Sequence, residues 1–157
     1  QVEPGEQVFD MFAGVGPYAI PMAEAGASVI ATDINPTAIE YLRANAERNG
    51  VADGIEAIAG DVRDVATSHK NWADRIVMNL PHSAQDFAET AVTLAGSECI
   101  IHYYDIQHED SPFERGEAVL RSAAGEDYAV EVLTRRTVRT YAPHEVNVVL
   151  DVRLREQ

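Results

Sequence analysis

Along most of the chain, apolar positions follow two alternating patterns, short continuous runs and segments with helical spacing. Short apolar runs bounded by glycine or polar residues indicate buried strands, and recurrence every three or four residues indicates helices. The predicted strands are Val8–Met11, Ser28–Thr32, Ile55–Ala59, Arg75–Met78 and Cys99–Tyr104. Four helices are predicted: Pro17–Ala25, a second helix between residues 36 and 48, Ser83–Leu94 and Phe113–Ala123. Asn35 and Pro36 mark the start of the second helix, and Asn49 and Gly50 mark its end. Ser83 is the expected cap of the third.

Two longer runs, Val130–Arg139 and Val146–Arg155, close the chain without a helix between them. The last run alternates apolar with charged residues, which is typical of a strand with one buried face. Alternating strands and helices predict a parallel sheet with helices on both faces, whereas a short connection joins only antiparallel strands. The pattern therefore predicts an α/β, Rossmann-like, mostly parallel seven-stranded sheet with an antiparallel C-terminal hairpin.

The first predicted strand breaks into a glycine loop that opens a helix. Glycine lets a backbone approach a ligand closely, and free N–H groups at the start of a helix face whatever binds there. Asp33 follows the second strand, about 20 residues further on, where an acid can hold a ribose diol. The loop predicts a nucleoside-cofactor site, with a simple tight strand-to-helix turn as the alternative. The loop residues concerned are Asp10, Phe12, Ala13, Gly14, Val15 and Gly16.

Polar residues follow each of the five predicted parallel strands. In an open parallel sheet, ligands bind outside the carboxyl ends of the strands, so these residues are expected to converge. Asp33 suits the ribose hydroxyls, Asp61 the adenine amino group, and Asp10 with the loop backbone an ammonium and a carboxylate. An acid such as Asp61 is also a common helix cap. The polar ends are Asp10, Asp33, Asp61, Asn79 and the pair Tyr104 and Asp105.

The loop also matches the G-x-G-x-x-A pattern of dinucleotide sites, from Gly14 to Ala19. An NAD-type oxidoreductase is therefore an alternative. A pyrophosphate would be repelled by Asp10 just before the loop, whereas a ligand with an ammonium and a sulfonium would be attracted. This charge argument favours S-adenosylmethionine over NAD.

Asn79, Leu80, Pro81 and His82 follow the fourth strand, where the reactive end of such a cofactor is expected. A side-chain amide carries both a donor and an acceptor and can pair with the edge of a nucleobase. Pro81 fixes the turn that would aim the amide. His82 is a candidate for contact with RNA phosphate, although an ordinary surface position is the simpler explanation.

Several motifs together resemble the catalytic domain of the archaeal and eukaryotic Trm5-type tRNA (guanine-37-N1) methyltransferases, the Met-10+ like family. They are Asp10–Pro17, Asp33–Pro36, Gly60–Arg63, Arg75–Ala84, Ile101–Asp105 and Tyr141–His144, and the likeness covers nearly the whole chain. The resemblance implies a class I methyltransferase fold, S-adenosylmethionine as cofactor, and methyl transfer to N1 of guanosine 37 in tRNA. It further implies that Asn79 holds the target guanine and Pro81 shapes its pocket. Ile34, Asn35 and Val62 join the expected cofactor site.

In this family, the substrate arginine, the acidic general base and a small tRNA-recognition domain lie upstream of the glycine loop. We therefore expect residues 1–157 to be one catalytic domain that binds cofactor but methylates tRNA poorly. Guanine N1 must lose its proton, which a positioned carboxylate would accept. The related wybutosine-pathway enzymes transfer an aminocarboxypropyl group instead, and they typically lack the Asn-Leu-Pro motif, so Asn79–Pro81 favours methyl transfer.

Basic and aromatic residues near the end of the chain are candidate RNA contacts. Arg135, Arg136 and Arg139 cluster on one predicted strand, and either a phosphate-binding patch or a solvated sheet face explains them. Tyr103 and Tyr104 are candidates to flank a flipped base, because chemistry on a base requires unstacking it, and packing in the fifth strand explains one of them equally well. We expect His102 to make a satisfied buried hydrogen bond rather than to catalyse.

Composition indicates the environment in which the protein works and the kind of partner it can bind. Twenty-six acidic against 12 basic residues give a net charge of −14, which resembles the surface of salt-adapted proteins. A polyanion such as tRNA must therefore bind through local contacts. The single cysteine, Cys99, suits a reducing cytoplasm and a buried position. No run of about 20 apolar residues predicts a membrane span, and no His/Cys cluster predicts a metal. We expect a cytoplasmic monomer.

Overall fold

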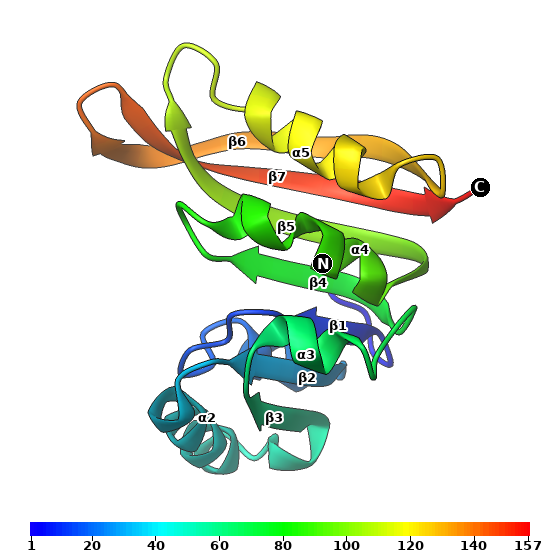
Figure 1. The fold of residues 1–157 in the computed structure, drawn as a ribbon. Helices are drawn as coiled ribbons and strands as arrows, with labels where there is room; N and C mark the ends of the chain where they lie inside the picture. Colours follow the sequence, from blue (N-terminus) through cyan, green and yellow to red (C-terminus); the bar gives the residue numbers. More distant parts are fainter.

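The computed structural model describes residues 1–157 and contains one seven-stranded sheet with the strand order β3-β2-β1-β4-β5-β7-β6. Strands β1 to β5 pair in parallel and β7 is antiparallel to both β5 and β6, so the predicted topology is confirmed (Figure 1). The strands are β1 Gln7–Asp10, β2 Ser28–Asp33, β3 Ile55–Ala59, β4 Ala73–Asn79, β5 Ala95–His108, β6 Tyr128–Ala142 and β7 Glu145–Glu156.

The helices cover both faces of this sheet unequally. They are α1 Ala19–Glu24, α2 Pro36–Arg48, α3 Val62–Ala66, α4 Ala88–Leu94 and α5 Glu114–Ala124, with short 3-10 turns η1 Ala52–Gly54 and η2 Ala84–Phe87. Helices α3, α4 and α5 lie together on one face (Figure 1), over the larger core cluster that contains Phe9, Met78 and Leu150. Helices α1 and α2 cover β2 and β3 from the opposite face, over the smaller cluster around Val8 and Leu42.

Alternation along the strands explains how one sheet supplies two cores. Neighbouring strand residues point to opposite faces, so Val8 joins the smaller cluster and Phe9 the larger one. In β7 the residues Val148, Leu150, Val152 and Leu154 are buried and Arg155 is exposed, as the alternation predicted. Cys99 is fully buried and behaves as a small core residue, and burial raises the pKa of its thiol.

Three helices differ from the prediction. The helix behind the glycine loop begins at Ala19 rather than at Pro17 and has six residues. The helix expected from Ser83 is split into η2 and α4, and the Ser83 side chain makes no capping hydrogen bond. Helix α3 was not predicted, because a five-residue helix gives almost no periodic signal. Asn35 caps α2 as expected, and its side chain accepts a hydrogen bond from the Thr37 amide at 3.0 Å.

None of the helices is long and apolar enough to cross a membrane.

Candidate functional site

The glycine loop lies where β1 ends, next to the end of β2. Gly14 and Gly16 have φ angles of 54° and 99°, the left-handed region that glycine enters without a Cβ penalty. A Cβ at Gly16 would lie 2.9 Å from Ile20 Cδ1, so packing also excludes a side chain there. Two hydrogen bonds tie the loop to its neighbours: the Ala13 amide donates to Thr32 O at 2.8 Å, and Asn45 Nδ2 to Val15 O at 3.1 Å.

Asp33 ends β2 and holds the loop from the side. Its Oδ2 accepts a hydrogen bond from the Gly14 amide at 2.9 Å, and its Oδ1 accepts one from the Asn35 amide at 2.9 Å. A carboxylate has about four lone-pair sites, so each oxygen can still accept a further donor. The loop and the acid that the sequence paired for a nucleoside site are therefore in direct contact.

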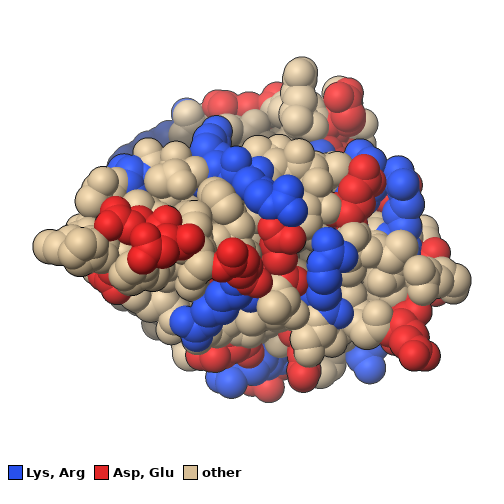
Figure 2. All heavy atoms as spheres, turned by 90° about the horizontal axis from the view of Figure 1, so that it is seen from above, with Lys and Arg blue, Asp and Glu red and all other residues tan.

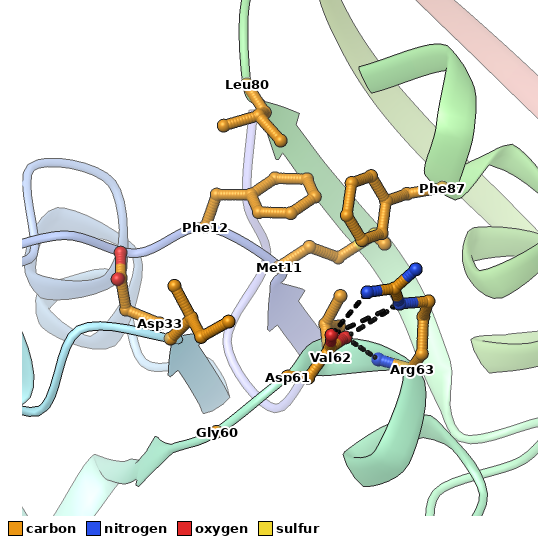
Figure 3. A pocket seen from close by; sticks show the side chains of 10 residues that line it. Met11, Phe12, Asp33, Gly60, Asp61, Val62, Arg63, Leu80 and Phe87 are labelled. Atoms are coloured by element: carbon orange, nitrogen blue, oxygen red, sulfur yellow. Dashed lines mark hydrogen bonds and ion pairs between the residues drawn. The ribbon is translucent and has the colours of Figure 1, made fainter. Parts of the chain in front are cut away.

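A hollow of about 180 Å³ opens beside Asp33, and we refer to it as the first hollow. Its lining side chains come from the ends of β1, β2 and β4 and from the segments that follow β3 and β4 (Figure 3). Apolar groups form most of this wall, with carboxylates at its margin, which is the usual composition of a small-ligand pocket. The lining residues are Met11, Phe12, Asp33, Ile34, Gly60, Asp61, Val62, Arg63, Leu80 and Phe87.

Asp61 stands at this margin and is already engaged. It caps α3, accepting a hydrogen bond from the Arg63 amide at 2.9 Å, and its two oxygens also accept from the Arg63 guanidinium (Figure 3). These donors favour the charged carboxylate and lower its pKa to about 2. The helix-cap alternative for Asp61 is therefore correct, and the residue lines the hollow as well.

A second hollow of about 340 Å³ lies on the other side of the Asn79–Pro81 segment. The Tyr18 and Tyr104 rings pack at its wall with their centroids 5.7 Å apart. Burial raises the pKa of the Tyr104 hydroxyl, as does its hydrogen bond with Tyr18. The lining residues of this second hollow are Tyr18, Asn79, Pro81, Tyr104, Asp105, Val138, Arg139, Asn147 and Val148.

The Asn79–Pro81 segment separates the two hollows. Leu80 lines the first hollow, whereas Asn79 and Pro81 line the second. None of the side-chain hydrogen bonds within residues 1–157 uses the Asn79 amide, so both its donor and its acceptor are available to a ligand. His82 follows with a φ of 80° and turns away from both hollows toward Tyr141.

Asp10 is fully buried beneath the glycine loop and lines neither hollow. Its Oδ1 accepts a long hydrogen bond from the Phe12 amide at 3.4 Å, and its Oδ2 has no partner. Burial is the main reason that its pKa rises to about 7, and the nearby charge of Asp33 adds to the rise. An unpartnered buried oxygen costs free energy unless something donates to it.

The three arginines expected to cluster do not share one face. A bulge at Val138 shifts the register, so that Arg136 pairs with Val149 and Arg139 with Asn147. Arg135 points to the opposite face and forms an ion pair with Glu117 of α5. The β6 and β7 arginines that form ion pairs are Arg135, Arg153 and Arg155. Arg136 and Arg139 are not among them, and only Arg139 lines a hollow.

His102 uses both of its ring nitrogens inside the sheet, as expected. Its Nε2 lies 2.7 Å from the Arg75 guanidinium, and its Nδ1 lies 2.6 Å from Asp151 Oδ1. This contact lowers the pKa of Asp151. Tyr103 is fully buried and donates a hydrogen bond to Asp105. No group of three or more His, Cys, Asp or Glu side chains in residues 1–157 is arranged to hold a metal ion.

The expected site residues thus divide into three sets. Those that line the first hollow are Phe12, Asp33, Ile34, Asp61 and Val62, and those that line the second are Asn79, Pro81, Tyr104 and Arg139. Those that line neither are Asp10, Ala13, Gly14, Val15, Gly16, Asn35, His82, Arg135 and Arg136. The expected site did not include ten further lining residues: Met11, Gly60, Arg63, Leu80 and Phe87 in the first hollow, and Tyr18, Asp105, Val138, Asn147 and Val148 in the second. Met11, Gly60, Arg63, Leu80 and Asp105 lie within the family motifs named above, whereas none of those motifs contains the other five.

A parallel sheet with a reversed last strand, a glycine loop joined to an acid on β2, and a hollow beside them define a Rossmann-like methyltransferase domain. Residues 1–133 match the TRM5/TYW2 methyltransferase domain model, and the chain belongs to this family. The family decides between the two alternatives raised by the glycine loop, because it is one of methyltransferases rather than of NAD-type oxidoreductases.

Two curated relatives represent the two named branches of the family. The chain is 42% identical to tRNA (guanine(37)-N(1))-methyltransferase Trm5b of Pyrococcus abyssi, over 96% of this chain and 44% of that protein. It is 36% identical to tRNA(Phe) (4-demethylwyosine(37)-C(7)) aminocarboxypropyltransferase of Pyrococcus horikoshii, over 97% of this chain and 55% of that protein. The chain thus spans about half the length of these relatives.

Solved structures show the same fold. The structure of M. jannaschii TYW2 in complex with AdoMet superposes with a TM-score of 0.93 at 31% identity, covering 99% of this chain and 71% of that one. The aTrm5 chain in its complex with tRNALeu superposes with a TM-score of 0.85 at 35% identity, covering 97% of this chain and 42% of that one. The class I methyltransferase fold is therefore confirmed.

Proposed function

We propose that residues 1–157 act as the catalytic domain of an enzyme that transfers a methyl group from S-adenosylmethionine to N1 of guanosine 37 in tRNA. One observation carries the proposal: a single three-residue segment, Asn79–Pro81, contributes to both hollows. A transferase must hold its donor and its acceptor next to each other, so that the transferred group passes directly between them. The similarity to Trm5b of Pyrococcus abyssi supports this choice of acceptor.

The first hollow fits the adenosine part of the cofactor. Asp33 still has lone pairs for the ribose hydroxyls, and Asp61 has one for the amino group of adenine. Ile34 and Val62 supply apolar surface for the base. M. jannaschii TYW2, whose fold the chain shares, was crystallised with AdoMet.

The glycine loop suits the amino-acid part of the cofactor. Gly14 has no atom within 4 Å of where its Cβ would stand, and Val15 next to it is exposed, so the backbone of the loop is open to a ligand at these two positions. Asn35 braces Asp33 from the other side. The unpartnered Oδ2 of Asp10 below the loop is the kind of orphaned acceptor that a nearby ammonium stabilises.

The second hollow fits the target base. Bound S-adenosylmethionine supplies an electrophilic methyl group on a sulfonium. Asn79 presents a donor and an acceptor to the base edge, Pro81 restricts the turn that carries it, and Tyr104 offers a ring face for stacking. Asp105 also lines this hollow, but it already accepts hydrogen bonds from Tyr103, Ile106 and Gln107, so we assign it a structural role.

Arg139, Arg136 and His82 are the proposed contacts for RNA phosphate. Figure 2 shows the molecule from above, on the side where β6 lies in Figure 1. On this face, basic side chains are interspersed with acidic ones and form no continuous basic band. RNA must therefore be held by a few local contacts. Two exposed apolar side chains also lie at the second hollow or at the turn after Pro81, and an RNA loop with unstacked bases would cover them. They are Val138, which lines the second hollow, and Tyr141, which contacts His82.

Aminocarboxypropyl transfer is the second candidate reaction, because the fold agrees closely with TYW2 and a P. horikoshii aminocarboxypropyltransferase is a relative. Both reactions use the same donor and leave different groups on tRNA. The mass of the modified nucleoside distinguishes them: methyl transfer requires the gain of one methyl group.

Calorimetry with S-adenosylhomocysteine tests the donor site. Asp33→Ala removes the ribose acceptor and a hydrogen bond to the loop, so we expect at least about a hundredfold loss of affinity, and about tenfold for Asp61→Ala. Asp53→Ala, an exposed carboxylate outside the hollow, is the control and should bind like the wild type. Unchanged affinity in both site variants would contradict this placement of the nucleoside.

We further propose that the protein is a monomer of the cytoplasm, adapted to high salt and independent of a metal. The net charge of −14 and the single buried cysteine support this setting.

A further inference from the structure

Arg63 is the one cationic side chain in the first hollow, and an ordinary nucleoside site does not require it. Its side chain is 62% exposed, and an exposed pair with an acid usually contributes little to stability. Its geometry is nevertheless unusually constrained. Its backbone amide, its Nε and its Nη2 all donate to the same carboxylate, that of Asp61.

A second contact holds the guanidinium from the other side. It lies over the Phe87 ring, 5.2 Å from the ring centroid, within range of a cation–π interaction. The Phe87 ring packs edge-on against Phe12 of the glycine loop, with centroids 5.0 Å apart (Figure 3). Arg63 is therefore fixed between an acid from the end of β3 and an aromatic pair that forms the wall of the hollow.

The hydrogen bonds of Asp61 show which of its oxygens is available. Oδ1 accepts from the Arg63 amide at 2.9 Å and from Nε at 3.0 Å, which uses both of its lone pairs. Oδ2 accepts from Nη2 and shares Nε at 3.2 Å, so it keeps room for one further donor. Arg63 thus determines both the charge and the orientation of the only free acceptor position on this carboxylate.

We propose that Arg63 is a positioning residue for base selection: it orients Asp61 so that the first hollow accepts a purine with a 6-amino group and rejects one with a 6-oxo group. An amino group donates to Oδ2, whereas an oxo group would place a second acceptor against an ionised carboxylate. The lowered pKa of Asp61 is consistent with this, since the carboxylate does not escape the repulsion by taking up a proton. The inference rests on the proposed donor site, and it attributes the preference of that site for adenine to the contact between Arg63 and Asp61.

The test compares S-adenosylhomocysteine with S-inosylhomocysteine, in which an oxo group replaces the 6-amino group, by calorimetry. For the wild type we expect the amino ligand to bind at least about tenfold more tightly, because a site that hydrogen-bonds an NH group rejects a ligand without it. Arg63→Gln should reduce this ratio to a value between about 1 and 3, because Asp61 keeps the hydrogen bond from the backbone amide but loses those from Nε and Nη2 of the guanidinium. Arg63→Lys keeps the charge and should give an intermediate ratio.

Arg48→Gln is the matched control, because Arg48 is an exposed arginine at the end of α2, outside both hollows. Its ratio should equal that of the wild type. If Arg63 only stabilises α3, the Arg63 variants melt at lower temperature but keep the wild-type ratio, and that result overturns the proposal. Should Arg63→Gln not fold, the ratio of Arg63→Lys decides in the same way. Failure of the wild type to bind either ligand would instead contradict the proposed donor site.

Discussion

The Tyr141 hydroxyl lies 3.3 Å from Nε2 of His82, although 59 residues separate the two. Their rings also pack edge to face, with centroids 5.3 Å apart. The contact joins the far end of the β6–β7 hairpin to the turn directly after Pro81. His82 is held there with a φ of 80°, which is uncommon for a residue with a side chain. The hairpin therefore supports the segment that separates the two hollows.

Removing this support should loosen the turn. Tyr141→Ala deletes both the hydrogen bond and the ring contact, worth about 1 kcal/mol together, so local opening of residues 80–84 should become about fivefold more frequent. Hydrogen exchange of the Ser83 and Ala84 amides, which donate to Leu80 O, measures this opening. Tyr41→Ala, an exposed tyrosine on α2, is the control. Equal exchange in the two variants would show that the contact supports nothing.

Asp10 should make stability depend on pH in an unusual direction. Its pKa rises from 3.8 to about 7 on folding, so between these values the folded protein keeps a proton that the unfolded chain has lost. Stability from this group is therefore complete below about pH 4 and declines as pH rises to 7, by at most about 4 kcal/mol. Urea unfolding of the wild type at pH 5 and pH 8 measures the decline.

Asp10→Asn has no proton to lose and should remove most of this pH dependence. Asp127→Asn, at an exposed carboxylate, should leave it in place. A wild type and an Asp10→Asn variant with parallel pH profiles would contradict the burial of an unpartnered carboxyl at this position.

Gly16 and Gly50 provide a matched pair of substitutions. Both have positive φ angles, 99° and 69°, but a Cβ at Gly16 would lie 2.9 Å from Ile20, whereas nothing lies within 4 Å at Gly50. Gly50→Ala should cost about 1 kcal/mol of unfolding free energy through backbone strain, and Gly16→Ala about 2–4 kcal/mol through strain and overpacking. Chemical denaturation measures both. Equal losses would mean that the neighbours of Gly16 move aside freely.

Arg139 and Arg135 should differ in their effect on RNA binding. Arg139 lines the second hollow without an ion pair, whereas Arg135 is held by Glu117. Losing one phosphate contact reduces the slope of log affinity against log salt by about 0.7–0.9, so Arg139→Gln should show this reduction and weaker binding. Filter binding of tRNA at several salt concentrations measures the slope. A larger effect from Arg135→Gln than from Arg139→Gln would refute the assignment.

Local sequence was sufficient for much of the fold and for part of the site. Apolar runs located the strands, and Asn35 with Pro36 located the start of α2, because these signals depend on neighbours along the chain. The glycine loop and Asp33 could be paired in advance, since strands β1 and β2 are adjacent and parallel and their carboxyl ends must meet. The ends of the helices were less certain, as the split of Ser83–Leu94 into η2 and α4 shows.

The arrangement of side chains around the hollows was decided only by tertiary structure. Arg135 and Arg136 lie on opposite faces by simple alternation, but only the bulge at Val138 brings Arg139 to the face of Arg136, and alternation along the strand cannot reveal an inserted residue. The contacts of Phe87 with Phe12, of Tyr18 with Tyr104 and of His82 with Tyr141 join segments distant in sequence. Sequence determined which chemical groups reach the edge of the sheet. Packing between remote segments decided which of them face a ligand, because burial and partner choice depend on the whole chain.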